Sequence, residues 1–498
     1  MKLFIFKIIV IIPLLSSAQW TQAGNDINGE HLGDESGYAV SLSSNGSILA
    51  IGAPENDGNG NASGHVRVFQ NTSGNWVQIG QDINGANPGD RFGYSVCLSG
   101  NGEILAVGTP YNDDNGSNAG IVRLFKKVGS NWLLINTFYG DSQGDFFGYA
   151  VSLSKNGNIL VIGAPRAGTS SVSDGEGHIK LYEKVNGNWI YRYTIEGNQE
   201  QEYFGSALSL SEDGSVLAIG AHRWPSLSSS RGAVRVYKRL NNTNSWLSLG
   251  ASIEGVNLGD EFGYSISLNS LGSILAIGVR RNDANGTNSG LVKTYELNAS
   301  ETAWVQLGND IIGNSGDYLG SSISINSNGD LLAAGASEAN SAAGLVRVYR
   351  NISGSWSQLG NDIVGENIQD FSASLGAIDL DSDGITLAVG AFGNDGNGSN
   401  SGHVRIFTNP ILSITDYNYK KTIILHPNPI NYLSILELGR KYNKVGLEFL
   451  NISGKLIKKE NYVNVSKVEL KTENLTKGVY FLKVKLPKEE ATIRMIKK

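Results

Sequence analysis

The chain has 498 residues, a formal net charge of −6 and one cysteine, Cys97. One thiol excludes an internal disulfide, so packing must stabilise the fold. Charge is unevenly distributed, because residues 420–498 carry 17 basic and 7 acidic side chains whereas residues 19–419 carry 21 and 39. The acidic larger part argues against nucleic-acid binding, since phosphate contacts need lysine or arginine.

The first 18 residues are typical of a secretory signal peptide. Lys2 and Lys7 form a basic start, an apolar stretch runs from Ile8 to Leu15, and small residues precede a cleavage site after Ala18. The apolar stretch is shorter than the roughly 20 residues that a membrane-spanning helix requires. We therefore expect a secreted protein with no transmembrane segment.

Seven copies of one motif occupy residues 19–408, and a tryptophan marks each copy. In the second copy, residues 92–99, 103–110 and 121–125 read as strands, and a fourth strand begins at Trp132. Short turns join these strands into hairpins, which predicts a four-stranded antiparallel blade and a radial β-propeller. The tryptophans are 52 to 58 residues apart, at Trp20, Trp76, Trp132, Trp189, Trp246, Trp304 and Trp356.

The Trp20 segment precedes any complete copy, and no equivalent segment follows residues 403–407. We expect these two segments to pair and close the ring, because closure removes exposed strand edges. The alternative is an open array with an unpaired last sheet. With the first strand of each copy innermost, the long loops after the second strands share one face, the top face. Loops on a rigid scaffold are where binding usually resides.

Phenylalanine–glycine pairs open the first strands and Gly-Ala-Pro closes several second strands. This pattern resembles the FG-GAP repeats of integrin α subunits, and the resemblance implies an all-β, seven-bladed β-propeller closed by its N-terminal strand. Later copies drift, with Leu319-Gly320 in place of the pair. The clearest matches are Phe92-Gly93, Phe147-Gly148, Phe204-Gly205 and Phe262-Gly263, with Gly52-Ala53-Pro54 and Gly163-Ala164-Pro165.

A linker at 409–420 leads to a basic region at 421–498, where alternating apolar residues predict a small β-sandwich. Its motifs resemble the type IX secretion sorting domain of Bacteroidetes-type bacteria, which implies the secretion machinery as a partner and a secreted or cell-surface location. The alternative is an accessory β domain. The motif residues are Pro427, Asn428, Pro429, Gly454, Lys455, Gly478, Val479 and Tyr480.

The seventh copy carries a candidate calcium site. FG-GAP repeats of the integrin type hold calcium in a D-x-D-x-D-G turn, and Asp379, Asp381 and Asp383 followed by Gly384 fit this pattern. Leu387 stands where a further acidic ligand is expected, and the other copies have mostly Ser and Asn. The alternative is a bare turn, as we expect in those six copies.

An acidic residue precedes each first strand and could ring the top mouth of the central channel as a ligand-attracting site. The local alternative is that each carboxylate accepts backbone N–H bonds in its own turn, and repetition favours this structural role. The residues are Asp34, Asp90, Asp145, Glu202, Asp260, Asp317 and Asp370.

One loop breaks the symmetry and is the best candidate for a ligand-binding site. It contains Arg223, Trp224 and Arg231, and aromatic and arginine side chains are favoured in binding sites. Cys97 occupies a position where other copies have serine, so we interpret it as a packed small residue rather than a nucleophile.

No triad, metal-binding histidine pair or nucleophile elbow is present in the sequence. We therefore expect a non-catalytic, monomeric adhesion or binding protein that recognises an unknown extracellular protein or glycan through its top face. No cofactor is expected apart from calcium in the seventh copy. The alternative is a propeller hydrolase or lyase that acts on polysaccharide.

Overall fold

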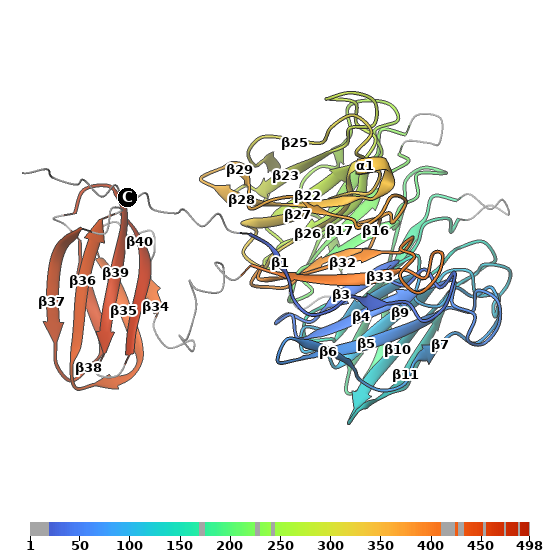
Figure 1. The fold of residues 1–498 in the computed structure, drawn as a ribbon. Coiled ribbons are helices and arrows are strands. Elements are labelled where there is room, and N and C mark those ends of the chain that lie inside the picture. Colours follow the sequence, from blue (N-terminus) through green and yellow to red (C-terminus); the bar gives the residue numbers. More distant parts are fainter. Residues whose placement is uncertain are drawn as a thin grey trace, which may run out of the picture. The chain divides into compact units, whose positions relative to one another are not determined.

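The computed structural model describes residues 19–168, 175–224, 230–240, 245–409, 424–426, 433–451, 455–472, 475–486 and 489–497. The chain divides into two compact units, residues 1–412 and 413–498. Both units are built from antiparallel strands, and the described residues include a single four-residue helix, α1 (Ala339–Ala342) (Figure 1). The division falls within the predicted linker, and the predicted signal peptide lies outside the described residues.

Seven antiparallel sheets make up the described N-terminal unit, which is propeller-like. Each sheet begins with a short strand, and these first strands contact one another in sequence, with the last against the first. Each hairpin is completed by a second strand. The first strands are β3 (Ala39–Leu42), β8 (Ser95–Leu98), β12 (Ala150–Leu153), β16 (Ala207–Leu210), β21 (Phe262–Leu268), β26 (Leu319–Ile325) and β31 (Ile378–Leu380). The second strands are β4 (Ile48–Ala53), β9 (Ile104–Thr109), β13 (Ile159–Ala164), β17 (Val216–Ala221), β22 (Ile274–Val279), β27 (Leu331–Ala336) and β32 (Thr386–Ala391).

The second strands are almost entirely buried, because each sheet is covered on both faces by its neighbours. Third strands follow the long loops, and fourth strands carry the tryptophans. The third strands are β5 (His65–Thr72), β10 (Ile121–Val128), β14 (His178–Val185), β18 (Ala233–Arg239), β23 (Leu291–Leu297), β28 (Leu345–Ile352) and β33 (His403–Thr408). The fourth strands are β6 (Asn75–Gln78), β11 (Asn131–Tyr139), β15 (Asn188–Glu196), β19 (Trp246–Ser248), β24 (Trp304–Gln306) and β29 (Ser355–Gln358). Five further short strands each pair with the third strand of a sheet: β2 (Ile27–Asn28), β7 (Ile83–Asn84), β20 (Ile253–Glu254), β25 (Ile311–Ile312) and β30 (Ile363–Val364).

The N-terminal segment completes the seventh sheet, as the sequence predicted. Strand β1 (Thr21–Gln22) pairs antiparallel with β33, and β2 pairs with the same strand nearer its start. In Figure 1, β1 (blue) lies beside β33 and β32 (orange). Trp20 is only 6% exposed and packs in the cluster of the sixth and seventh sheets. Residues about 380 positions apart therefore share one sheet.

The tips of the first hairpins are joined by a closed circuit of backbone hydrogen bonds. Each tip donates an N–H to the carbonyl of the next sheet's tip, over 2.8–3.1 Å, until the circuit returns to its start. Such a circuit fixes the spacing of the first strands at this end of the unit. The donors, in order, are Ser44, Gly100, Lys155, Glu212, Ser270, Ser327 and Ser382, and each bonds the residue named after it, the last bonding Ser44.

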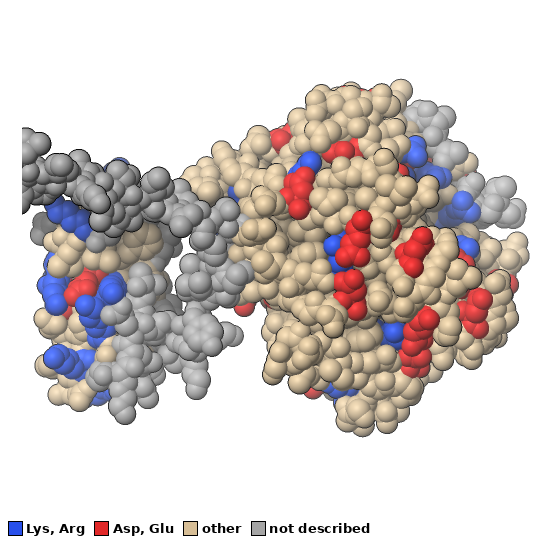
Figure 2. Space-filling model, in the orientation of Figure 1, with Lys and Arg blue, Asp and Glu red and all other residues tan. Residues whose placement is uncertain are grey.

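The described part of the C-terminal unit forms two antiparallel sheets that share one apolar cluster. Val445, Leu447 and Phe449 of one sheet and Leu436 and Leu470 of the other are buried in this cluster. Lysine and arginine side chains dominate its described surface, whereas acidic side chains are more frequent on the N-terminal unit (Figure 2). The strands are β34 (Ile424–His426), β35 (Leu433–Tyr442) and β38 (Val465–Lys471) in one sheet, and β36 (Val445–Asn451), β37 (Leu456–Tyr462), β39 (Gly478–Leu486) and β40 (Glu489–Lys497) in the other.

Candidate binding site at the channel mouth

A central cavity of about 280 Å³ is lined by residues of all seven innermost segments. In four copies a tyrosine follows the glycine at the start of the innermost segment, so aromatic rings gather at the end where the first strands begin. Tyr38 and Tyr94 lie 5.0 Å apart between ring centroids, and Tyr94 and Tyr149 lie 5.2 Å apart. Burial raises the pKa of Tyr94 and Tyr149 well above the ordinary value. These hydroxyls are therefore neutral and can only donate or accept hydrogen bonds.

At the other end of the first strands, a second cavity of about 190 Å³ is lined in part by one lysine, Lys155. The Lys155 ammonium bonds Glu212 and donates to Ser327 Oγ at 2.9 Å and to Ser382. These groups belong to the hairpin tips that form the hydrogen-bonded circuit. Hydrogen bonds therefore close this end of the channel. The other end, where the first strands begin and the tyrosines gather, is called the mouth and is the more suitable place for a ligand.

The acidic residues before the first strands are held in their own turns. Asp34 Oδ2 accepts the N–H groups of Glu30 and His31 at 3.1 and 2.9 Å, and Asp370 makes the equivalent bonds at 3.1 and 2.9 Å. Glu202 is fully buried and forms a bidentate pair with Arg235 at 2.8 Å. All seven are at most 8% exposed, which favours the local structural role over a ligand-attracting ring.

The residue that follows each of these acids has a positive φ in all seven copies, although none is glycine. Such a backbone costs of order 1–3 kcal/mol when the residue is bulky, and persists because the surrounding structure imposes it. The position varies freely in chemistry, unlike the acid before it. Its occupants are Glu35, Arg91, Phe146, Tyr203, Glu261, Tyr318 and Phe371, with φ between 49° and 59°.

Two of these residues line a cavity of about 370 Å³ at the mouth. Phe146 and Tyr203 contribute from the strained position, and Tyr111, Arg166 and Arg223 come from the segments that follow the second strands. Tyr94, Tyr149 and Pro165 complete the wall. The cavity therefore combines aromatic faces with two guanidinium groups, a lining typical of ligand sites.

The guanidinium groups are held by aromatic rings. Arg166 lies 4.8 Å from the ring centroid of Phe146, and its Nε donates to the Tyr203 hydroxyl at 2.9 Å. Arg223 lies 4.1 Å from the ring centroid of Tyr203. A cation–π contact of this kind orients the Arg223 guanidinium and leaves its outer N–H groups available. Among the described residues, no carboxylate lies within 4.0 Å of a nitrogen of Arg223.

The mouth is asymmetric in charge. On the Arg223 side, buried His222 accepts or donates a 2.8 Å bond with Ser206, and burial together with Arg223, Arg280 and Arg281 lowers the pKa of His222 to about 3. Elsewhere on the mouth, burial and then the neighbouring Glu55 raise the pKa of Glu35 to about 7. An anionic group is therefore favoured on the arginine side.

The three residues predicted from the irregular loop separate in the structure. Arg223 lines the mouth cavity, Trp224 packs against the apolar cluster around Phe204 and Trp246, and Arg231 is exposed outside the cavity. The loop's intervening residues 225–229 lie outside the described residues. Of the predicted trio, only Arg223 is placed with the other candidate binding groups.

The predicted calcium ligands of the seventh copy do not converge. Asp379 is half-buried in β31, where its carboxylate accepts the Leu42 N–H at 2.7 Å and the Ser324 hydroxyl at 3.2 Å. Asp381 accepts the N–H groups of Ile385 and Thr386, and Asp383 is exposed. The three are not among the described carboxylate and histidine groups whose ligand atoms lie together. The calcium site therefore stays a prediction, and in this structure Asp379 and Asp381 accept backbone N–H groups as their serine equivalents do.

Cys97 also accepts a backbone N–H from a neighbouring sheet. Its Sγ accepts the N–H of Leu153 in the next sheet at 3.3 Å, as Ser41 Oγ accepts that of Leu98 at 3.0 Å. Burial raises the pKa of the Cys97 thiol to about 12, which suppresses the reactive thiolate. The thiol is a structural hydrogen-bond acceptor between sheets.

Sequence reasoning missed the aromatic half of the cavity. The residue that follows each acid varies among Glu, Arg, Phe and Tyr across the seven copies, and the residues after the second strands also vary. That variability inside a regular repeat was the available signal, since binding residues depart from the pattern that builds the scaffold. Of the residues that line this cavity, only Arg223 was predicted to bind a ligand.

Several predicted sorting motifs cannot be placed, because Pro427, Asn428, Pro429 and Gly454 lie outside the described residues. Lys455 precedes β37, and Gly478, Val479 and Tyr480 begin β39. Tyr480 is 7% exposed and donates its hydroxyl to the Thr476 carbonyl at 2.8 Å. The Gly-Val-Tyr motif therefore begins a strand of the smaller unit, with its tyrosine in the core.

Comparison with known families agrees with these two units. Residues 84–125 match the FG-GAP repeat, and residues 424–498 match the secretion system C-terminal sorting domain. The protein is thus an exported protein that carries FG-GAP repeats and ends in a sorting domain, which implies interaction with the secretion machinery and a secreted or cell-surface location.

A more particular likeness is to integrin alpha-M of Mus musculus. The two are 26% identical over 230 residues, which cover 44% of this chain and 19% of the integrin. The chain thus matches about a fifth of that relative's length. The likeness supports the FG-GAP assignment and leaves the ligand open.

Among solved structures, the WD40 repeats of RRP9 match with a TM-score of 0.47 and 15% identity, over 78% of this chain and 99% of that one. A periplasmic gluconolactonase of Pseudomonas aeruginosa matches with a TM-score of 0.45 and 13% identity, over 65% and 84%. Likenesses this distant say nothing about activity. None of the described residues belongs to a helix long and apolar enough to cross a membrane.

Proposed function

We propose that the N-terminal unit is a seven-bladed β-propeller that acts as a non-catalytic binding module, and that a C-terminal β-sandwich serves its export. The seven sheets, the pairing of β1 with β33 and the closed circuit of tip hydrogen bonds support the propeller. The apolar cluster shared by two sheets supports the sandwich. Export places the propeller where it can meet an extracellular glycan or protein.

The observation that carries the binding proposal is the cavity around Phe146, Arg166, Tyr203 and Arg223. Aromatic faces offer flat apolar contact, and the N–H groups of the Arg223 guanidinium offer paired donors that suit a carboxylate or sulfate. A cavity of about 370 Å³ accommodates one or two sugar rings. We therefore favour an acidic glycan over a protein as the ligand.

A glycan array with the mature protein tests this proposal. We expect binding to uronate- or sulfate-bearing oligosaccharides, weaker binding to their neutral counterparts, and a decline with added salt because surface charge attraction is screened. Binding to none of the acidic members, or equal binding to neutral ones, would contradict the proposal. A screen against extracellular protein fragments then becomes the next step.

A second candidate is hydrolysis or cleavage of polysaccharide, and one observation favours it. The pKa of Glu35 is raised to about 7, chiefly by burial and then by Glu55, and a carboxylic acid of this kind can act as a general acid at neutral pH. Product analysis of the array members decides between the two. New reducing ends or unsaturated products that disappear in Glu35→Gln would replace the binding proposal with an enzymatic one.

A further inference from the structure

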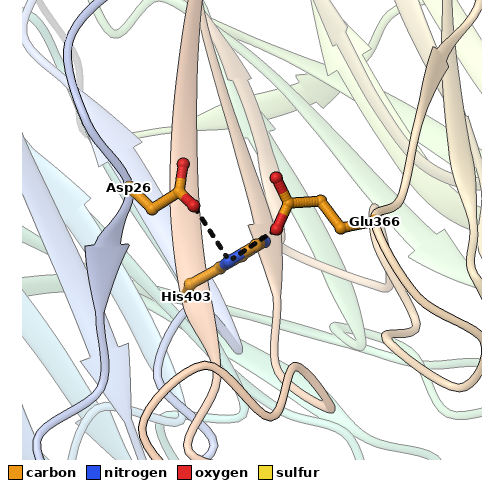
Figure 3. A group of neighbouring side chains, drawn as sticks. All are labelled: Asp26, Glu366 and His403. Atoms are coloured by element: carbon orange, nitrogen blue, oxygen red, sulfur yellow. Dashed lines mark ion pairs between the residues drawn. The ribbon is translucent and has the colours of Figure 1, made fainter.

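A histidine and two carboxylates from distant parts of the chain meet beside the closing strand. Asp26 precedes β2, Glu366 lies in the turn after β30, and His403 is the first residue of β33. His403 Nδ1 lies 4.0 Å from Asp26 Oδ2 and 4.0 Å from Glu366 Oε2, and Figure 3 shows both carboxylates directed at the ring. The three ligand atoms lie within 4.8 Å of one another.

The imidazole is buried without any bonded partner. His403 is 0% exposed, and neither of its ring nitrogens has a hydrogen-bond partner among the described residues. A buried polar nitrogen in this state has lost its hydration without compensation. Asp26 and Glu366 have side chains that are 28% and 39% exposed, so a small ion can reach the cluster from solvent.

The donor set suits a divalent transition-metal ion. One imidazole nitrogen and two carboxylate oxygens are ligands that zinc accepts, whereas calcium prefers oxygen ligands alone. Bonds of about 2.0–2.2 Å to zinc require the donor atoms to close in slightly from 4.0 Å, which partly exposed carboxylates can do. Arg405 Nη1 lies 3.6 Å from Glu366 and offsets one negative charge, so one net negative charge remains for a cation.

The same arrangement recurs one sheet further on. His65 Nδ1 lies 3.9 Å from Glu30 Oε2, and Asp82 completes a group with all ligand atoms within 4.8 Å. His65 is 1% exposed, and its Nε2 has no hydrogen-bond partner among the described residues. Arg67 takes the place of Arg405, at 3.5 Å from Glu30.

A third histidine occupies the same strand position but lacks the second carboxylate. His178 begins β14, and Asp141 stands where Glu30 stands, but there it pairs with Lys180. Thr194 takes the place of Asp82, because Ile195 pairs with Ile179 as Ile83 pairs with Val66. His178 is therefore a natural control for a buried histidine at this position.

We propose that the clusters Asp26–Glu366–His403 and Glu30–His65–Asp82 each bind one divalent transition-metal ion, with zinc as the reference ion. The first cluster joins the sixth sheet to the seventh, and the second joins the seventh to the first. Residues 26 and 30 both belong to the N-terminal segment that completes the seventh sheet. The two ions therefore fasten this segment on both sides and stabilise closure of the ring.

Native mass spectrometry and calorimetry with zinc chloride, on protein first dialysed against a chelator, test the proposal. We expect two zinc ions per chain, a rise in thermal midpoint with zinc, and no comparable rise with calcium chloride. His403→Ala and His65→Ala should each remove one ion and the double variant both, whereas His178→Ala should retain two.

Asp26→Asn and Glu366→Gln change partly exposed side chains and keep their shape, so these two variants should still fold if the histidine variants do not. Each should reduce zinc binding to one ion while circular dichroism stays unchanged. Absence of zinc binding by the wild-type protein would overturn the proposal. So would an unchanged count of two ions in the double histidine variant.

Discussion

The two ends of the central channel differ in what the seven copies share. At the hairpin end, every copy contributes the same backbone bond, and the circuit through Ser44, Lys155 and Ser382 is uniform although the side chains differ. At the mouth, every copy has the same strained backbone, but the side chains range from Glu35 to Phe146 and Arg91. Repetition thus builds the ring, and variation at one repeated position supplies the chemistry.

This contrast separates stability from recognition. Changes at closure and packing positions should alter unfolding and leave ligand preference intact. Changes at the mouth should alter ligand affinity with little effect on unfolding. Three substitutions, from the largest expected effect on stability to the smallest, measure whether the two properties are separate.

Trp20→Ala should have the largest effect on stability, because Trp20 is 6% exposed and anchors the closing segment. Removing a buried tryptophan costs roughly 3–5 kcal/mol, which urea unfolding of the mature protein measures. Trp76→Ala is the matched control at the same repeat position, where the side chain is only half-buried, and should cost less. Equal losses in the two variants would show that closure contributes no special stability.

Asp379→Asn should change the pH dependence of stability. Burial raises the pKa of Asp379 to about 6, so the folded state holds a proton that the unfolded chain releases near pH 4. Stability is therefore greater below pH 4 and falls as pH rises to about 6. Asparagine mimics the protonated form and should flatten this fall, with a gain of roughly 2–3 kcal/mol at pH 8.

The asparagine oxygen can still accept the Leu42 N–H, and its amide can donate to Ser324 Oγ. Urea unfolding at pH 4, 6 and 8 measures the effect, and exposed Asp383→Asn is the control with no expected change. A loss of stability at pH 8 in Asp379→Asn would show that the carboxylate is stabilising in its ionised form.

Phe146→Gly should have a small net effect on stability and a large one on binding. Glycine adopts the φ of 56° found at this position without strain, which offsets part of the lost ring contacts, so we expect a change of about 1 kcal/mol or less. Affinity for an acidic oligosaccharide should fall at least about tenfold, as for other aromatic binding residues. Retained affinity would remove Phe146 from the site.

The sequence was sufficient for most of the scaffold. Tryptophan spacing, Phe-Gly pairs and strand alternation predicted where the strands lie, because repeat period and turn chemistry are local properties. The count of tryptophan segments then predicted that the Trp20 segment pairs with β33. The calcium site of the seventh copy stays a prediction, since Asp379 and Asp381 match a metal-ligand pattern but their oxygens accept backbone N–H groups in a strand and a turn.

The candidate site was harder to foresee because it depends on tertiary placement. Tyr111, Phe146 and Tyr203 come from different sheets, and no spacing in the sequence brings them together. The metal clusters depend even more on closure, since Asp26 and His403 are neighbours only in the completed ring. Arg223 could be predicted because its loop differs in sequence from the equivalent loops of the other copies.

The most direct test of the central claim compares the affinity of wild-type protein and Arg223→Ala for the acidic oligosaccharide that binds best on the array. We expect Arg223→Ala to lower affinity at least about tenfold and to change unfolding by no more than about 0.5 kcal/mol. Exposed Lys126→Ala, which also removes one positive charge, should bind as the wild type does. Equal affinity in wild type and Arg223→Ala would contradict the claim that the variable mouth is the binding site.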